Sequence, residues 1–276
     1  MVLGLAIEAL VFPHFNDKRK AQTIALWSRR LINILSVRLS LTGEIPASPQ
    51  PTLIVANHVS WLDIFVINSL LPSRFVAKSE IREWPILGWL TAKAGTLFLK
   101  RGKRGDLREV NDEIASVLKS GQRVAIFPEG TTSGAHSLKH FHASLFEPAV
   151  RAQARVVPVA IRFSRPDGSP NTDIEYLDDV TFWQSVQQAL AQPEVLVTLD
   201  FCPPISSGGK NRRELARAAE ALIADALTSN ATETPSYHAD GPRSDSVPTR
   251  SPYPAQADSR ESRGPTLTSG RKSLEH

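Results

Sequence analysis

His58 and Asp63, a histidine and an aspartate five positions apart, are the residues whose types and spacing most readily suggest chemistry in this chain. The run 52–56 before them is short, apolar and β-favouring, and the run 63–67 can be helical, which predicts that His58 stands on a strand-to-helix turn. Five residues on a straight helix rotate the side chain by about 140°, so the pair meets only if His58 lies just outside the helix and Asp63 within its first turns. In that geometry the carboxylate holds one ring nitrogen and leaves the other available as a base.

Other polar segments also follow apolar runs that are predicted to be strands. A turn at the end of a buried strand is where an open α/β sheet presents chemistry, so these segments are candidates for function. The polar residues are Lys100 and Arg101 after the run 95–99, and Glu129, Gly130, Thr131 and Thr132 after the run 123–127 and Pro128. A further apolar run, 156–161, predicts another buried strand.

The segments 57–63, 95–101, 123–133 and 156–161, in this order, resemble those of the glycerolipid acyltransferase family of the His-x4-Asp type. The best-known bacterial members of this family are 1-acyl-glycerol-3-phosphate acyltransferases. The resemblance spans about residues 50–165 and rests on the identity, order and spacing of separate segments. It implies a mixed central β-sheet flanked by helices, and direct acyl transfer from acyl carrier protein (acyl-ACP) or coenzyme A (acyl-CoA). It also implies that Arg101 and the turn Glu129-Gly130-Thr131 bind the acyl acceptor.

The roles of His58 and Asp63 follow from their own chemistry. A hydroxyl is a poor nucleophile at neutral pH, so transfer from a thioester to an alcohol needs a base that removes the proton as the oxygen attacks. His58 suits that role, and Asp63 would fix its tautomer and stabilise the imidazolium that forms. Because the substrate hydroxyl replaces a catalytic serine, no covalent enzyme intermediate is required. We expect no cofactor beyond the acyl-ACP or acyl-CoA co-substrate.

The polar turns also bear on the acceptor head group. Lys100 and Arg101 could hold a phosphate or a carboxylate, because a guanidinium binds such anions in bidentate fashion; a solvated surface loop is the alternative. The commonest family pattern continues Glu-Gly-Thr-Arg-Ser, whereas this chain has Thr132 where the arginine would stand. Loss of that cation removes a contact worth about 1.5–3 kcal/mol to a phosphate. A threonine there resembles acyltransferases that use other lyso-lipids, including those that complete ornithine lipids.

Several other classes of site and partner are disfavoured. His136, His140 and His142 suggest a metal cluster, but no cysteine or dense acidic set accompanies them, so we expect no metal site. His140 and His142 could instead line the acceptor channel. The basic residues fall beside apolar segments and not beside aromatic platforms, which argues against nucleic acid as a partner. The sequence contains no phosphate loop, dinucleotide fingerprint or serine-hydrolase elbow.

Composition and the N-terminal region favour an anionic membrane surface as a partner. The net charge is +4 with a pI of about 9.3, and the 276 residues, 41% of them hydrophobic, can bury a sizeable core. The apolar run 2–12 is shorter than the ~20 residues of a spanning helix. The segment 21–41 predicts an amphipathic helix, either interfacial on lipid or packed on its own domain. We expect a peripheral or monotopic protein on the cytoplasmic face of the inner membrane, and the single cysteine, Cys202, fits that reducing side.

The chain divides into three predicted parts. Residues 1–42 form a membrane-associating helical segment, and 43–228 form a three-layer α/β domain. Residues 229–276 are rich in Ser, Pro, Thr, Arg and Asp and should form a disordered tail. Further elements predicted within the domain are helices at 180–190 and 211–227 and a strand at 195–201.

The preferred function is transfer of a fatty acyl group to the free hydroxyl of a lyso-lipid. The first acceptor is 1-acyl-glycerol-3-phosphate (lysophosphatidate), which would give phosphatidate for phospholipid synthesis. Lyso-ornithine lipid, or another lyso-lipid, is the alternative acceptor. A non-catalytic lyso-lipid-binding protein is a second alternative, but such a protein has little need of a base together with its orienting acid.

Overall fold

The computed structural model describes residues 12–46, 50–83, 88, 91–92, 95–99, 104–134, 137–177 and 180–229. All of these lie in one of the two units into which the chain divides, residues 1–240. The strands are β1 (Val37–Gly43), β2 (Thr52–Ala56), β3 (Arg74–Lys78), β4 (Leu97–Leu99), β5 (Arg123–Ile126), β6 (Arg155–Ser164), β7 (Val195–Phe201) and β8 (Ile205–Ser206). The helices are α2 (Asp17–Ile34), α3 (Leu62–Leu70), α5 (Arg104–Lys119), α6 (Glu147–Ala152), α7 (Phe182–Ala191) and α8 (Arg212–Ser229), with 3-10 turns η1 (Phe12–His14), η2 (Ser79–Glu83), η3 (Ala143–Phe146) and η4 (Thr172–Ile174).

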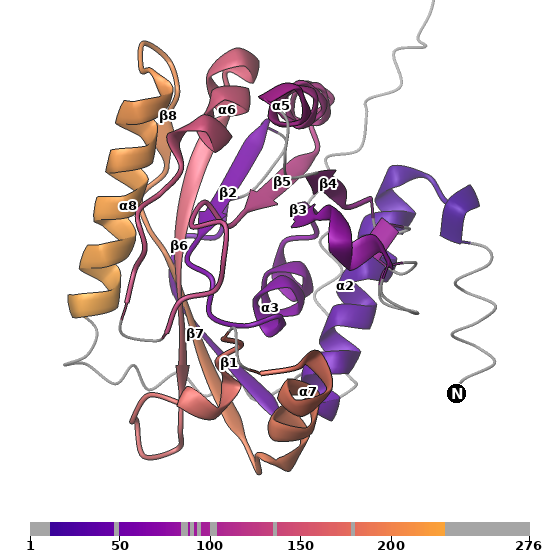
Figure 1. Ribbon diagram of the computed structural model, residues 1–276, viewed down its shortest axis with the longest axis vertical. Coiled ribbons are helices and arrows are strands. Elements are labelled where there is room, and N and C mark those ends of the chain that lie inside the picture. The colour runs from indigo at the N-terminus through magenta and orange to yellow at the C-terminus, as the bar shows by residue number, and fades with distance from the viewer. Residues whose placement is uncertain are drawn as a thin grey trace, which may run out of the picture. The chain divides into compact units, whose positions relative to one another are not determined.

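The strands form one mixed sheet in the order β1-β7-β6-β2-β5-β3-β4, with β8 paired to β6 (Figure 1). Strands β6, β2, β5, β3 and β4 run parallel to one another. β1 and β7 run parallel as a pair, and β7 and β8 pair with β6 in antiparallel fashion. β2 lies between β5 and β6, with Ile54 paired to both Ala125 and Val157. The carboxyl ends of β2 and β5 therefore meet at the same edge of the sheet.

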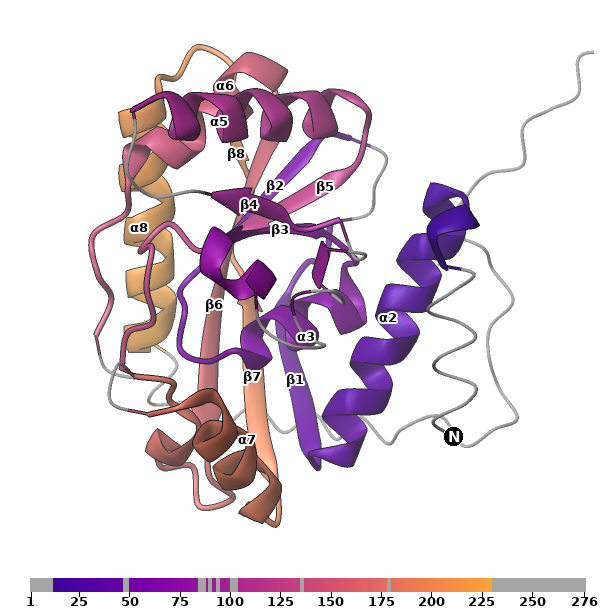
Figure 2. The same cartoon turned by 45° about the vertical axis from the view of Figure 1, so that its right-hand side comes forward.

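Helices cover both faces of the sheet and produce three layers (Figures 1 and 2). On one face, α2, α3 and α7 contribute Ile32, Val66 and Ala189 to a common apolar core. On the other face, α5, α6 and α8 cover the second core, with Ile114 of α5 and Ile223 of α8 among its fully buried side chains. A mixed sheet between two helical layers is the architecture that the sequence predicts.

β2 is buried from end to end, which explains its unbroken apolar sequence. Ile54 and Ala56 belong to the core under α3, whereas Leu53 and Val55 belong to the core under α5. A strand covered on both faces needs no polar alternation. Because β2 ends at Ala56, the turn that carries His58 begins directly after this buried run.

Most of the elements predicted from the sequence are observed. His58 lies between β2 and α3, and Asp63 lies in the first turn of α3, as their spacing requires. The runs 52–56, 123–127 and 156–161 correspond to β2, β5 and β6, and the predictions for 180–190, 195–201 and 211–227 correspond to α7, β7 and α8.

The helix predicted for 21–41 is wrong at its C-terminal end. α2 begins earlier, where the Asn16 side chain accepts a hydrogen bond from the Arg19 N–H at 2.9 Å, and it ends at Ile34. Ser36 then adopts a positive φ of 52°, and the chain enters β1, which pairs in parallel with β7. The apolar residues at 37, 39 and 41 fit a strand period, and pairing with β7 decides in its favour.

α2 packs on its own domain through one face. Ala25, Ser28 and Ile32 are buried, and the Arg29 side chain donates to the Ser69 carbonyl in α3 at 2.8 Å. Packing on the domain, one of the two expectations for this segment, is therefore observed, while membrane contact stays a prediction. Among the described helices, none has the length and apolar character needed to cross a membrane. The run 2–11 and the tail from 230 onward lie outside the described residues.

Gly43 generates a test of the β1–β7 pairing. It has a φ of +74°, and a Cβ there would overlap the carbonyl oxygen of Phe201. Gly43→Ala should lower the free energy of unfolding by about 2 kcal/mol or more, because the φ is unfavourable and the backbone contact must open. Gly121→Ala is the matched control: it has a φ of +80° with nothing within 4 Å, so only the φ preference, about 1 kcal/mol, is lost. Urea denaturation compares the two variants, and equal losses would contradict the close approach.

Candidate active site

The side chain of Asn57 ends β2 and directs the chain out of the sheet. Its Nδ2 donates to the Ile161 carbonyl at 3.0 Å, and its Oδ1 accepts the Ile161 N–H at 2.8 Å. Asn57 is nearly fully buried, so these bonds satisfy backbone groups of β6 that have no access to water. The amide takes over the pairing that a longer β2 would make, and the main chain is free to turn at His58.

His58 and Asp63 are in direct contact. The His58 Nδ1 lies 2.7 Å from Asp63 Oδ2, and the same oxygen accepts the N–H groups of Val59 and Ser60 at 2.8 and 3.0 Å. Asp63 is fully buried at the start of α3, where backbone donors and the helix N-terminus favour a negative charge. Its Oδ1 has no hydrogen-bond partner in the described part of the chain. With a carboxylate as partner, Nδ1 carries the proton and Nε2 keeps its lone pair.

A ring contact fixes the orientation of His58. The imidazole stacks on Phe127 with the ring centroids 4.0 Å apart and the planes 8° apart, and Phe127 in turn stacks on Phe75 of β3. The His58 side chain is 20% exposed, whereas Asp63 is not exposed at all. The imidazole is thus held along one edge and one face yet open to an incoming group, which a general base requires.

Glu129 joins the turn after β5 to the turn after β2. Its Oε1 accepts the His58 N–H and its Oε2 accepts the Lys139 N–H, both at 2.8 Å. Burial raises the pKa of the Glu129 carboxyl, although the two backbone donors act in the opposite direction. Because the folded chain then binds this proton more tightly than the unfolded chain, stability is lost as the pH rises from the ordinary carboxyl range through the raised pKa. Both carboxylate oxygens of the buried Glu129 accept hydrogen bonds from backbone N–H groups. The geometry therefore makes Glu129 a positioning residue for His58.

The turn after Glu129 also contacts the His58 segment. Gly130 has a φ of +72°, a conformation that glycine adopts readily, and its Cα faces the His142 ring. Three residues on, the Ser133 N–H donates to the His58 carbonyl at 2.7 Å. The backbone of His58 is therefore bonded through its N–H to Glu129 and through its carbonyl to Ser133, which holds both sides of the residue.

Thr132 links this turn to a third segment. Its hydroxyl donates to the Tyr176 carbonyl, and the Tyr176 N–H donates to the Val59 carbonyl at 3.0 Å. The Lys139 ammonium donates to the Thr132 carbonyl at 2.8 Å. These hydrogen bonds connect the His58 turn to Thr132 and Tyr176, which are distant from it in sequence.

The structure brings together some of the residues predicted for the site and leaves others undescribed. His58, Asp63, Glu129 and Thr132 lie in contacting segments, and Thr131 is half-buried in the same turn. Lys100 and Arg101 lie outside the described residues, so their role in acceptor binding stays a prediction.

The histidines weighed as metal ligands have other contacts. His140 pairs with Glu220 of α8 at 3.0 Å, and the His142 ring lies beside Gly130. His136 lies outside the described residues. Within the described ranges, no group of three or more His, Cys, Asp or Glu side chains could hold a metal ion.

Sequence reasoning missed four residues that shape the site: Asn57, Ser133, Lys139 and Tyr176. Asn57 directly precedes His58 and Ser133 directly follows Thr132, and this adjacency to the predicted site residues could have marked them as candidates. Tyr176 acts through backbone groups, and Lys139 acts through its backbone N–H as well as its ammonium. The partners of all these groups depend on tertiary folding and cannot be inferred from residue type.

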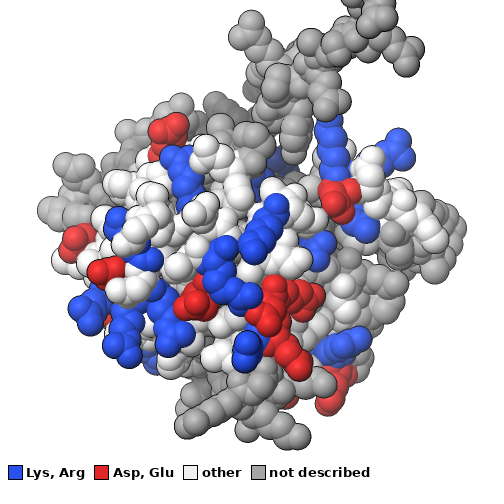
Figure 3. Space-filling model, turned by 90° about the horizontal axis from the view of Figure 1, so that it is seen from above, with Lys and Arg blue, Asp and Glu red and all other residues white. Residues whose placement is uncertain are grey.

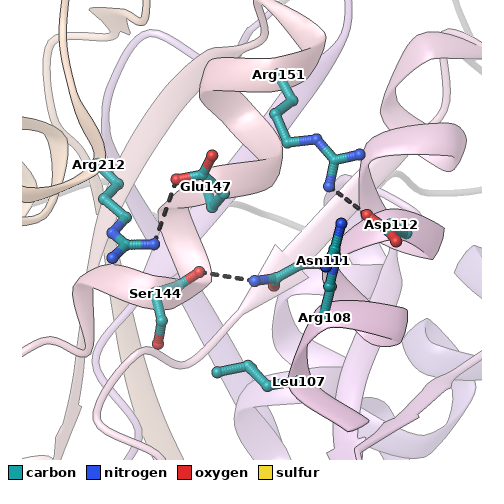
Figure 4. Close-up of a pocket in the computed structure, with 8 residues that line it drawn as sticks. All are labelled: Leu107, Arg108, Asn111, Asp112, Ser144, Glu147, Arg151 and Arg212. Carbon is teal, nitrogen blue, oxygen red and sulfur yellow. Dashed lines mark hydrogen bonds and ion pairs between the residues drawn. The ribbon is translucent and has the colours of Figure 1, made fainter. Parts of the chain in front are cut away.

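A pocket of about 550 Å³ lies elsewhere, between α5, α6 and the start of α8 (Figure 4). Its arginines are partly neutralised, since Arg151 pairs with Asp112 and Arg212 lies 3.5 Å from Glu147. Figure 3 looks onto this end of the molecule and shows basic and acidic side chains intermixed. None of the residues lining the pocket comes from the His58–Asp63 or Glu129–Ser133 segments, so we place no chemistry there.

Comparison with known proteins identifies the relatives of this chain. A family model described as Acyltransferase matches residues 38–162. A lyso-ornithine lipid O-acyltransferase from Pseudomonas aeruginosa is 41% identical over 75% of this chain and 79% of the relative. A 1-acyl-sn-glycerol-3-phosphate acyltransferase from Neisseria meningitidis is 35% identical over 67% of this chain and 72% of the relative.

The fold is confirmed by a solved structure. The crystal structure of a 1-acyl-sn-glycerophosphate (LPA) acyltransferase from Thermotoga maritima matches with a TM-score of 0.63. The match covers 84% of this chain and 90% of that one at 23% sequence identity. It confirms the helix-flanked central sheet.

Glu129→Gln tests whether this residue positions His58 or binds the acceptor. Glutamine replaces one of the two acceptor oxygens by an NH₂ donor, so the N–H of either His58 or Lys139 loses its acceptor. The His58 turn should therefore shift. We expect kcat to fall by about 10²-fold, the cost of a small misplacement of a catalytic group, with little change in the KM of the acceptor. Glu147→Gln, which removes a carboxylate from the pocket near α8, is the control and should leave kcat unchanged. A raised acceptor KM at constant kcat would show instead that Glu129 binds the acceptor.

Proposed function

This chain belongs to the glycerolipid acyltransferase family and is an O-acyltransferase, and on that premise we propose that it acylates the free hydroxyl of 1-acyl-sn-glycerol-3-phosphate with His58 as general base. The product would be phosphatidate, a precursor in phospholipid synthesis. The observation that carries the proposal is the 2.7 Å contact between His58 Nδ1 and Asp63 Oδ2, beside the buried Glu129.

The reaction needs one proton transfer at a defined atom. His58 Nε2 takes the proton of the acceptor hydroxyl as the oxygen attacks the thioester carbonyl. The new C–O bond forms, the C–S bond breaks, and the proton passes from the imidazolium to the departing thiolate. Asp63 stabilises the imidazolium while it exists. General base catalysis of this kind contributes about 10²–10⁴-fold to the rate.

Direct transfer is supported by the surroundings of His58. In the described ranges, Asp63 is the hydrogen-bond partner of the imidazole, and no serine or cysteine side chain is hydrogen-bonded to it. Burial raises the pKa of the Cys202 thiol to about 11, with the nearby Asp200 charge acting in the same direction. Cys202 therefore stays protonated at neutral pH and is unsuited to act as a nucleophile.

Lyso-ornithine lipid is the second candidate acceptor, and Thr132 favours it. The family's common pattern has an arginine at this position, whereas here a hydroxyl is bonded to the Tyr176 carbonyl. A phosphate monoester loses a charge-assisted contact by that change, and a zwitterionic head group loses less. The relative from Pseudomonas aeruginosa, which is named for this acceptor, supports keeping both candidates.

The donor and the location complete the proposal. An acyl-ACP or acyl-CoA thioester supplies the acyl group, and the enzyme acts as a peripheral or monotopic protein on the cytoplasmic face of the inner membrane. The net charge of +4 supports contact with anionic lipid. The exposed arginines Arg19 and Arg30 of α2 support the same contact.

His58→Ala tests the catalytic assignment. Turnover of an acyl-CoA donor with lysophosphatidate or lyso-ornithine lipid should fall by about 10³-fold or more, because the base is lost while the fold is kept. His140→Ala is the matched control, since His140 is mostly exposed and pairs with Glu220, and it should retain activity. Product formation is followed by mass spectrometry of the lipid extract. Substantial turnover by purified His58→Ala protein would contradict the role of His58.

Thr132→Arg tests the acceptor. Restoring a cation should raise the ratio of kcat/KM for lysophosphatidate over lyso-ornithine lipid by about tenfold or more, the value of one charge-assisted contact. Thr132→Val removes the same hydroxyl bond without adding charge, so it separates the loss of the Tyr176 contact from the gain of the cation. An unchanged ratio in Thr132→Arg would show that this position does not face the acceptor head group.

A further inference from the structure

α7 places two large apolar side chains, Trp183 and Leu190, on the outside, whereas Phe182 packs on Trp61. Trp183 is 72% exposed and Leu190 is 57% exposed, whereas the buried residues of the helix are the small Ser185 and Ala189. A helix that covers a domain normally turns its large apolar residues inward. This arrangement cannot be explained by the packing of α7 on its own core.

The two exposed residues lie on one stripe. Trp183 and Leu190 are seven positions apart, which is close to two helical turns, so they point the same way. Helices α5 and α8 differ, since Ile114 and Leu118 of α5 and Ile223 of α8 are fully buried. α2 also exposes large apolar side chains, Leu26 at 40% and Ile34 at 61%, but that helix carries several basic residues. Among the described helices, an outward apolar stripe on an uncharged helix is a property of α7.

α7 also carries no charge. None of its ten residues is acidic or basic, and its exposed positions between Trp183 and Leu190 are glutamines. Its N-terminus is satisfied internally, because Thr181 and Gln184 form a reciprocal capping box. An uncharged, internally capped helix can approach lipid without removing an ion from water.

Contacts connect α7 to the catalytic turn. The Trp61 indole N–H, between His58 and Asp63 in sequence, donates to the Ser185 hydroxyl at 3.0 Å. The Trp61 ring lies 5.6 Å from Phe182, and Phe182 lies 5.9 Å from Trp183, centroid to centroid. An aromatic series thus runs from the loop that holds the base to the exposed tryptophan. Both cartoon views place α7 at the end of this unit away from α5 and α6 (Figures 1 and 2).

We propose that the exposed face of α7, formed by Trp183 and Leu190, is a membrane-docking surface that seats the catalytic turn against the lipid bilayer. The proposal rests on the proposed function, because a lyso-lipid acceptor is held in a membrane and its hydroxyl must reach His58. Tryptophan favours the interface between lipid and water, where its ring is apolar and its N–H meets polar groups. A neutral stripe needs no anionic lipid, so this contact is distinct from the basic residues of α2.

The test measures binding to vesicles of phosphatidylcholine alone, which offer no net charge and no substrate. The full chain carrying Trp183→Ser and Leu190→Ser should partition at least about tenfold less than the wild type, because two interfacial side chains are lost. Leu190→Ser alone should lose several-fold. Ile45→Ser, which removes an aliphatic side chain of 37% exposure between β1 and β2, is the matched control and should bind as the wild type does.

Activity separates this proposal from the proposed function. The double variant should keep its kcat/KM for a short-chain, monomeric lysophosphatidate and show a raised KM for the same head group presented in vesicles. Wild-type protein that acylates neither acceptor would refute the proposed function and leave the vesicle result standing. Unchanged partitioning of the double variant would overturn the docking proposal. So would a change in its oligomeric state without lipid, since that would assign the stripe to a protein contact.

Discussion

The hydrogen bond between His58 Nδ1 and Asp63 Oδ2 is the interaction on which the rest of the site depends. Asp63 is fully buried, and its ionised form is supported by the N–H groups of Val59 and Ser60 at the start of α3. A base held in this way needs a turn of fixed shape between strand and helix. The Asn57 amide, bonded to both polar groups of Ile161, ends β2 at the residue from which that turn can begin.

The parallel pairing of β2 and β5 supplies the second half of the arrangement. Because the two strands end at one edge, Glu129 can reach the His58 N–H and Ser133 can reach the His58 carbonyl. The carboxylate of Glu129 is buried against its electrostatic preference, as its raised pKa records, and backbone donors offset part of that cost. Residues of the turn after β5, for which the family resemblance predicts acceptor binding, therefore fix the backbone that carries the base.

The sequence was sufficient for the parts of the structure that depend on local pattern. The fully apolar run 52–56 predicted a buried strand, and the spacing of His58 and Asp63 predicted a turn followed by a helix. It was insufficient at 37–41, where the same apolar residues suit a helix or a strand until β7 is present to pair with. Lys139 and Tyr176 could not be found, because their bonds to Glu129 and Val59 use backbone N–H groups that every residue other than proline possesses. The carbonyl that accepts from the Lys139 ammonium, that of Thr132, is likewise set by tertiary folding. The outward stripe of α7 was hidden for a related reason: a periodic apolar pattern does not say which face meets the core.

A double-mutant cycle of His58→Ala and Asp63→Asn tests the central claim most directly. If Asp63 acts through the imidazole, Asp63→Asn alone lowers the rate constant of acyl transfer by about 10²–10⁴-fold. It then changes nothing further when His58 is already alanine, because the group that it orients is gone. Single-turnover measurements with an acyl thioester and one lyso-lipid acceptor give the four rate constants. Effects that multiply in the double variant would contradict the account, since they would show that the aspartate serves the reaction independently of the histidine.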